Sequence, residues 1–320
     1  MTELRFDGEA VLVTGAGRGV GREHALSLAS RGAKVVVADL GTALDGSGRS
    51  SGPADEVVKE IRDAGGEAVA CGESVADPAG AKAMVELALD SFGRLDAVIN
   101  NAGIHFPEMF EDYVLDDFRR MMEVHYFGTL NVCQNAWKHF LKSGGGRIVN
   151  TVSEGLVGLS PTSTAYGSAK GAVTGLTLCL AAEGPLHNIR VNGFSPRVRT
   201  RLSSGEVMEK AFGRPAETFK RMEGLYPPEL SSFAAVYMVH SSCELNGVLL
   251  SSGGNTALRW AVMEGGAAEA HSIEELAANI GAIMAMPGMM HMGVGISGKA
   301  PHVGALHEEK ARQAQAAARA

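Results

Sequence analysis

Residues 14–21 read TGAGRGVG and directly follow a short apolar stretch, Ala10–Thr14. Glycines at this spacing permit a tight turn that lets the backbone approach a phosphate closely, and the helix expected at Gly19–Arg31 would point free N–H groups and its positive dipole end at the same anion. An acid, Asp39, follows about 20 residues later, at the end of the next apolar run. A carboxylate there can hydrogen-bond the ribose diol of an adenosine and repel a 2′-phosphate. The stretch therefore predicts a dinucleotide site and favours NAD. NADP is the alternative, because the cation of Arg18 could bind a 2′-phosphate.

The rest of the chain continues the alternation of short apolar runs and helical stretches. Strands are expected at Ala10–Thr14, Lys34–Asp39, Glu67–Cys71, Ala97–Asn100, Arg147–Thr151, Ile189–Gly193 and Val248–Leu250. Helices are expected at Gly19–Arg31, Pro53–Ala64, Pro78–Phe92, Leu115–Val124, Gly128–Leu141, Thr164–Gly184 and Glu229–His240. This order predicts an α/β fold, a Rossmann-like doubly wound parallel sheet of about seven strands flanked by helices.

No further strand is expected beyond Asn255. We expect one domain over residues 1–255 and a C-terminal extension over residues 256–320. The extension should contain a helix at Ser272–Met284 that Ser272 caps, a Met-rich segment at Met284–Met292 and a polar helix at His307–Ala320. Methionine adapts to irregular apolar surfaces, so the Met-rich segment either lines a substrate pocket or fills a core or subunit contact.

Composition limits the class of partner. The 320 residues carry 29 Lys and Arg against 36 Asp and Glu, a formal net charge of −7. Nucleic acid and anionic membranes both require clustered basic residues, so neither is expected as a partner. The four cysteines are widely spaced and no histidine has metal-ligand spacing, which predicts no metal and a reducing, cytoplasmic location. Neither a signal-peptide pattern nor a membrane-spanning apolar run is found.

Three further residues have the pattern of an acid–base site. Tyr166 and Lys170 are four positions apart at the start of an expected helix, so they share one face. A neighbouring ammonium stabilises a phenolate, and Tyr166 could then exchange a proton with a carbinol or carbonyl oxygen during hydride transfer. Ser153 follows the fifth expected strand, at the sheet edge where ligands bind, and its hydroxyl could bind the same oxygen. A Tyr–Lys pair at this spacing is common and by itself does not indicate catalysis. The phosphate loop and Asp39 in the same chain favour a catalytic role for it.

These residues resemble those of the short-chain dehydrogenase/reductase family. TGAGRGVG is similar to the family's TGxxxGxG loop, Asn100-Asn101-Ala102-Gly103 to its NNAG segment, and Ser153, Tyr166 and Lys170 to its Ser and YxxxK positions. The resemblance spans roughly residues 5–255. It implies that the cofactor contacts are Gly15, Arg18, Gly19, Val20, Gly21, Asp39, Ser74, Val75, Asn101, Ala102, Gly103, Tyr166, Lys170, Pro196, Val198 and Thr200.

A narrower resemblance suggests the substrate. RFDGEAVLVTGAGRGVGR, VHYFGTLNVCQNAWKHF and MVHSSCELNGVLLSSGGNTALRW are similar to the (3R)-hydroxyacyl-CoA dehydrogenase region of peroxisomal multifunctional enzymes type 2 and to stand-alone bacterial acyl-CoA and 17β-hydroxysteroid dehydrogenases. This resemblance implies an NAD-dependent (3R)-3-hydroxyacyl-CoA dehydrogenase, with a 17β-hydroxysteroid dehydrogenase as the alternative. It also implies a homodimer or homotetramer. A nucleotide-binding sensor on the same fold is the non-enzyme alternative.

The chain departs from the family pattern at two places. His125 stands where most members have an Asn that positions a water beside the Lys. Its imidazole could hold that water and shuttle protons, or it could simply pack there. After the sixth strand the family's Pro-Gly is Pro196-Arg197, and Arg197, Arg199 and Arg201 alternate. These guanidinium groups either face an anionic substrate group, such as a CoA phosphate, or are solvated.

Overall fold

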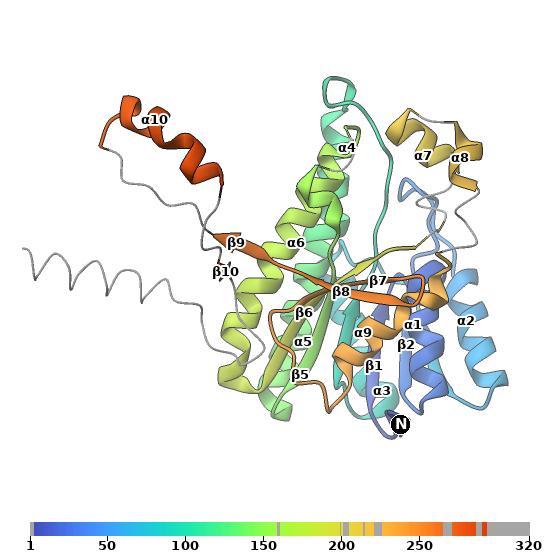
Figure 1. Cartoon of the computed structure of the whole chain (residues 1–320). Helices are drawn as coiled ribbons and strands as arrows, with labels where there is room; N and C mark the ends of the chain where they lie inside the picture. Colours follow the sequence, from blue (N-terminus) through green and yellow to red (C-terminus); the bar gives the residue numbers. More distant parts are fainter. Residues whose placement is uncertain are drawn as a thin grey trace, which may run out of the picture.

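The computed structural model of the chain describes residues 3–158, 161–198, 200, 205–213, 215–220, 226–264, 271–285 and 290–292. An eight-stranded sheet runs through the centre of the molecule with helices on both faces (Figure 1). Its strands are β1 (Ala10–Thr14), β2 (Lys34–Ala38), β3 (Glu67–Cys71), β4 (Ala97–Asn100), β5 (Gly146–Thr151), β6 (Ile189–Pro196), β7 (Leu249–Gly253) and β8 (Thr256–Trp260). Within the part of the chain that the structure describes, no helix combines the length and apolarity needed to cross a membrane.

The strand order is β3-β2-β1-β4-β5-β6-β7-β8, which confirms the doubly wound fold. Strands β1 to β7 pair in parallel, and β8 pairs antiparallel with β7. The chain crosses from one half of the sheet to the other between β3 and β4, so β1 lies between β2 and β4. In open α/β sheets a ligand crevice forms at such a reversal, outside the carboxyl ends of the strands.

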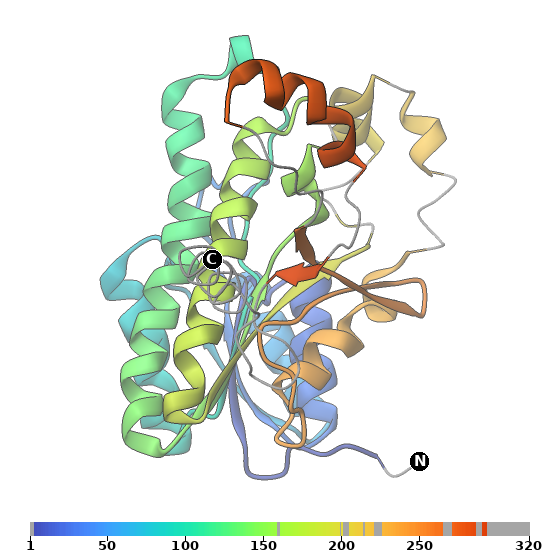
Figure 2. The ribbon, with the colours of Figure 1, turned by 60° about the vertical axis from the view of Figure 1, so that its left-hand side comes forward.

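Helices cover both faces of the sheet. The longer helices are α1 (Gly19–Ser30), α2 (Gly52–Asp63), α3 (Pro78–Phe92), α4 (Leu115–Met122), α5 (Gly128–Ser143), α6 (Thr164–Glu183), α7 (Gly205–Phe212), α9 (Ser232–Val239) and α10 (Ile273–Met284). Shorter helical turns are η1 (Phe110–Asp112), η2 (Glu123–Phe127), η3 (Glu154–Val157), η4 (Gly184–His187), α8 (Ala216–Lys220) and η7 (Pro228–Leu230). Figure 2 shows α5 and α6 lying side by side along one side of the molecule.

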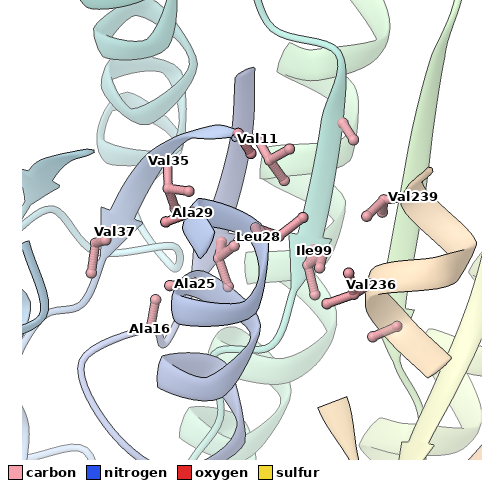
Figure 3. Packing of buried hydrophobic residues seen from close by; sticks show 14 of the residues in the cluster. Val11, Ala16, Ala25, Leu28, Ala29, Val35, Val37, Ile99, Val236 and Val239 are labelled. Carbon is pink, nitrogen blue, oxygen red and sulfur yellow. The ribbon is translucent and has the colours of Figure 1, made fainter. Parts of the chain in front are cut away.

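The alternation of side chains along each strand divides the core between the two faces. Val11 and Val13 of β1 pack with α1, α2 and α9, whereas Leu12 between them packs on the opposite side with α3 and α5. Figure 3 shows the first of these clusters, in which Leu28 of α1 lies beside Val11 and Val236 of α9 lies beside Ile99. Because both faces are buried, the strands are nearly continuous apolar runs, which is why they are visible in the sequence.

The sequence predicts that one helix ends at Val124 and the next begins at Gly128, with a break between them. In the structure no loop separates the two helices α4 and α5. The π-helical turn η2 joins them into one run. Gly128 has ordinary helical backbone angles, and a Cβ there would lie 2.6 Å from Val75 Cγ2. The glycine therefore serves close packing within a continuous helix and does not mark a break.

The prediction that no strand follows Asn255 is wrong. Strand β8 forms a hairpin with β7 through Gly254 and Asn255, which both have positive φ angles of 55° and 63°. Two such residues make the tight turn typical of two-residue hairpins. A second, two-stranded sheet pairs β9 (Val262–Glu264) with β10 (Met290–Met292). The sequence does not predict β8, because the side chains of this strand are mostly exposed and lack a clear apolar pattern.

The helix predicted at Ser272–Met284 is confirmed as α10, and Ser272 Oγ accepts a hydrogen bond from the Glu275 N–H at 3.1 Å. Of the Met-rich segment, Met286 and Met289 lie outside the described residues, as does the expected polar helix at His307–Ala320.

Candidate active site

A cleft of about 980 Å³ opens at the carboxyl ends of the strands, where the strand order reverses. The sequence-predicted residues that line it are Gly15, Arg18, Gly19, Val20, Asp39, Ser74, Val75, Asn101, Ala102, Gly103, His125, Ser153, Tyr166, Lys170, Pro196, Val198 and Thr200. They come from segments that follow six different strands. The fold therefore gathers into one cleft side chains that are up to 185 residues apart, from Gly15 to Thr200.

The glycine loop is bound to the segment after β4. Thr14 Oγ1 accepts hydrogen bonds from the N–H groups of Asn101 and Ala102 at 3.0 and 3.1 Å. The Asn101 side chain donates to the carbonyl oxygens of Thr14 and Gly15, both at 3.0 Å. A Cβ at Gly15 would lie 2.7 Å from Ala102 Cα, so only glycine allows this approach.

Gly21 is the one predicted cofactor residue that does not line the cleft. A Cβ at Gly21 would lie 2.3 Å from both Gly15 O and Asn101 Nδ2. Its place is behind the loop, where it lets α1 pack against Gly15. The structure thus gives Gly21 a packing role, and its direct contact with a cofactor stays a prediction.

Asp39 is held at the end of β2 by two backbone donors. The N–H groups of Gly17 and Gly41 donate to its two carboxylate oxygens at 2.8 and 2.7 Å. Leu40 follows it, and both residues line the cleft. The carboxylate is therefore fixed in orientation, and the position after it offers no cation to a 2′-phosphate.

Ser153, Tyr166 and Lys170 lie together at the other end of the cleft. Burial raises the pKa of Tyr166, and a hydrogen bond with Ser153 acts in the opposite direction. Burial also lowers the pKa of Lys170 to about 7. The Lys170 Nζ donates to the Thr151 carbonyl at 2.6 Å and lies 5.8 Å from the centroid of the Tyr166 ring. Ser153 Oγ also accepts from the Gly155 N–H at 3.0 Å, which holds the serine oxygen beside the phenol.

His125 lies behind this group, on the π-helical turn η2. Its ring is 2 % exposed, and a Cβ at Gly103 would lie 2.5 Å from its Cε1. Nε2 is 2.8 Å from the Ile104 carbonyl oxygen and 3.2 Å from the Ile104 backbone nitrogen. Nδ1 is buried and has no hydrogen-bond partner among the described residues. Burial, with the nearby charge of Lys170, keeps the pKa of His125 well below its usual value, so the ring is neutral.

Several residues of the cleft were not predicted from the sequence, and Glu154 is one of them. Its carboxylate pairs with Arg197, at 3.0 Å from Nε to Oε1 and 2.9 Å from Nη2 to Oε2, so the Arg197 side chain is not free to bind a substrate anion. The two residues are 43 positions apart, so no spacing could have indicated the pair. His105 packs edge-on against Tyr166 with ring centroids 4.9 Å apart, and Arg120 and Met208 also line the cleft. Arg199 and Arg201 lie outside the described residues.

Comparison with known proteins agrees with this geometry. Residues 9–204 match the family model described as short chain dehydrogenase. The chain is 39% identical over 253 residues to a short-chain type dehydrogenase/reductase of Mycobacterium tuberculosis, covering 79% of this chain and 84% of that one. It is 40% identical over 259 residues to the peroxisomal multifunctional enzyme type 2 of Mus musculus, covering 80% of this chain but only 33% of that protein. The chain thus spans about a third of the mouse relative.

A solved structure is similar as well. It is a 7α-hydroxysteroid dehydrogenase complexed with NADH and 7-oxo glycochenodeoxycholic acid, 29% identical, with a TM-score of 0.66 over 79% of this chain and 97% of that one.

Proposed function

Because the chain belongs to the short-chain dehydrogenase/reductase family and is an oxidoreductase that acts on CH–OH donors, we propose that it is an NAD-dependent enzyme interconverting a secondary alcohol and a ketone in the cleft described above. The observation that carries this proposal is the position of Ser153, Tyr166 and Lys170 in the same cleft as the glycine loop and Asp39. A protein that only senses nucleotide would have no need of the acid–base group.

The residues of the cleft fit a dinucleotide. Gly15, Arg18, Gly19 and Val20 line the cleft, so the N-terminus of α1 opens on it, which suits a pyrophosphate. The fixed carboxylate of Asp39 is suited to a ribose diol and repels a 2′-phosphate, so we assign NAD in preference to NADP despite Arg18. A nicotinamide held beside Tyr166 would supply or accept the hydride.

The proton is handled by Tyr166. In the oxidation direction its phenol oxygen takes the proton of the substrate hydroxyl, and in the reduction direction it donates a proton to the carbonyl oxygen. Ser153 would donate a hydrogen bond to the same oxygen when its hydroxyl turns from Tyr166 to the substrate, while its oxygen keeps the hydrogen bond from the Gly155 N–H. Lys170 can charge or discharge near neutral pH, since its pKa is lowered to about 7, and it can therefore replenish the proton of the phenol.

His125 completes the route by which we propose that protons reach Lys170. Its neutral ring presents a buried nitrogen without a hydrogen-bond partner among the described residues, Nδ1, near the Lys170 charge that lowers the pKa of the ring. A water bonded to Nδ1 would lie behind the catalytic group, in the role that an Asn has in most of the family. The alternative, that the ring only packs against Gly103, predicts that His125→Asn has no effect on turnover.

The substrate that we propose is a (3R)-3-hydroxyacyl-CoA, on the strength of the 40% identity to the mouse peroxisomal multifunctional enzyme type 2. The second candidate is a 17β-hydroxysteroid, which the structural likeness to a hydroxysteroid dehydrogenase supports. A panel of 3-hydroxyacyl-CoA chain lengths beside 17β-hydroxysteroids, assayed with NAD and NADP, separates the two. Arg199 remains a candidate for a CoA phosphate. If it has that role, Arg199→Ala should raise the KM for CoA thioesters but not for pantetheine thioesters.

We also propose that the enzyme is a cytoplasmic homodimer or homotetramer. The four cysteines are all free thiols, which suits a reducing compartment. Large apolar side chains are exposed next to the adjoining helices α5 and α6, with Phe127 41% and Leu141 48% exposed (Figure 2). A second subunit packed there would cover them.

Replacement of the phenol tests the mechanism. Tyr166→Phe should lower kcat by about 100-fold or more, because general acid–base catalysis typically contributes that much. Cofactor affinity, measured by titration of nicotinamide fluorescence, should stay near the wild-type value. Tyr113→Phe is the matched control, since Tyr113 also donates through its hydroxyl, to Phe106 O at 3.2 Å, and does not line the cleft. Turnover retained by Tyr166→Phe would refute the assigned role.

A further inference from the structure

A charged pair lies in the cleft directly beside Ser153. Glu154 accepts two parallel hydrogen bonds from the Arg197 guanidinium, at 3.0 and 2.9 Å, and a third from the Ser251 hydroxyl. Such a forked Arg–carboxylate pair fixes both side chains in one relative orientation, which a Lys or a single hydrogen bond does not. The hydrogen bonds from Arg197 and Ser251 overcome the effect of burial and hold the pKa of Glu154 below its usual value, so the pair is charged at neutral pH.

The pair joins segments that follow neighbouring strands. Glu154 follows β5 and is bonded covalently to Ser153, whereas Arg197 follows β6 and opens the segment from Pro196 to Thr200. Ser251 belongs to β7, which pairs with β6. The two residues therefore connect the serine that faces the substrate oxygen to the segment proposed to contact the nicotinamide.

The segment after β6 is held from more than one side. Its backbone is fixed by the Arg197 N–H, which donates to Ser252 O at 2.8 Å, and Val198 packs against the core cluster that includes Val11 and Val236. Arg197 and Val198 also line both the cleft and a second cavity of about 480 Å³, whose walls include Tyr226 and Leu258. On the side of the cleft, the Glu154 carboxylate ties the Arg197 side chain to the segment after β5.

We propose that Glu154 and Arg197 are positioning residues, which keep Ser153 and the segment Pro196–Thr200 at the separation that the reaction requires. The proposal rests on the proposed function, because the distance to be kept is the one between the substrate oxygen and the nicotinamide. The guanidinium also neutralises a carboxylate that would otherwise lie without a cation next to Ser153.

The test is a double-mutant cycle with Arg197→Ala, Glu154→Ala and the double variant. A matched control is Arg94→Ala. Arg94 forms the same forked pair with Asp96, at 2.8 and 2.6 Å, and Asp96 likewise accepts one further hydrogen bond, from the Ala10 N–H. The exposed side-chain fractions are close, 53% and 25% for Arg94 and Asp96 against 45% and 27% for Arg197 and Glu154. The control pair lies at the opposite end of the sheet.

We expect Arg197→Ala to lower kcat by ~10-fold or more and to weaken NADH binding, because it leaves the carboxylate uncompensated. The double variant should be no worse than Arg197→Ala alone. Arg94→Ala should change melting temperature by a similar amount but leave kcat, KM and NADH affinity at the wild-type values. If Arg197→Ala has the same kcat, KM and NADH affinity as Arg94→Ala, the proposal is overturned.

Two further outcomes separate this proposal from the proposed function. If the wild-type protein oxidises no alcohol but binds NADH, the function fails, and the pair is then judged by NADH affinity alone. An unchanged affinity in Arg197→Ala would in that case overturn the pair's role. Additive losses in the double variant would show that the two residues act independently, which also contradicts a positioning pair.

Discussion

At the scale of single residues, the buried ammonium of Lys170 is the most consequential charge in the cleft. Burial lowers its pKa to about 7 from the model-peptide value of 10.5. Between these two values the unfolded chain carries a proton that the folded protein lacks, so the folded state gains stability as pH rises through this window. Below the lower value both states are charged, and the full cost of burying the charge remains.

This cost predicts a pH-dependent difference between the wild type and Lys170→Met. The free energy of unfolding of the wild type should rise relative to the variant by about 1.4 kcal/mol per pH unit within the window. Urea denaturation of both proteins at several pH values from neutral to about pH 10 measures it. A difference that stays flat, or falls as pH rises, would contradict a buried, neutralised lysine. His125, which is neutral in both proteins, cancels from the comparison.

Gly21 gives a second prediction at this scale. Gly21→Ala should weaken NAD binding by ~10-fold or more, because the new Cβ would lie 2.3 Å from Gly15 O and displace the loop. Gly281→Ala is the control, since Gly281 is also helical and its Cβ would meet nothing within 4 Å. Isothermal titration with NAD compares the two. Equal affinities would show that α1 does not need to approach the loop so closely.

At the scale of elements, the sequence predicts best what is buried on both sides. The parallel strands β1 and β4 are buried along their whole length and have the predicted residues, because their apolar runs are continuous. The antiparallel strand β8 is missed because its side chains are mostly exposed and follow no apolar pattern, and the π-helical turn η2 is missed because the sequence predicts a break between two helices there. The same limit applies to the cleft. Tyr166 and Lys170 are close in sequence, whereas the Glu154–Arg197 pair depends on the adjacency of β5 and β6. The division of the chain at residue 255 stays a prediction.

The turn of the hairpin between β7 and β8 gives a prediction about what defines the strand that the sequence did not reveal. Asn255→Val should lower the free energy of unfolding by about 1–2 kcal/mol, because a β-branched residue is strained at positive φ. Asn255→Gly should be neutral or slightly stabilising, since glycine adopts this conformation without strain. Thermal denaturation of the two variants against the wild type measures the difference. Equal stability of the two would mean that the turn does not define the hairpin.

At the scale of the whole molecule, the net charge of −7 is not continued inside the cleft. Four carboxylates line its walls, those of Asp39, Glu73, Glu123 and Glu154, against four basic side chains, those of Arg18, Arg120, Lys170 and Arg197. Selection against the additional phosphate of NADP should therefore depend on the local charge of Asp39 and not on the field of the whole cleft. A ligand that binds only the folded state stabilises it by about 2.7 kcal/mol at a hundred times its Kd, so the choice between cofactors can be read from thermal denaturation without knowledge of the substrate.

We expect NAD to raise the melting temperature more than NADP at equal concentration, and Asp39→Asn to narrow that gap by weakening NAD binding and strengthening NADP binding. The amide keeps one oxygen that can accept from Gly17 or Gly41, so the loops stay bound. Asp45→Asn serves as the control, since Asp45 lies on the same loop, accepts from the Ser47 N–H at 2.9 Å and does not line the cleft. Equal shifts with both cofactors in the wild type would remove Asp39 as the selector. A preference for NADP would instead assign the dominant role to Arg18, which lines the same cleft and would then have to bind the 2′-phosphate against the charge of Asp39.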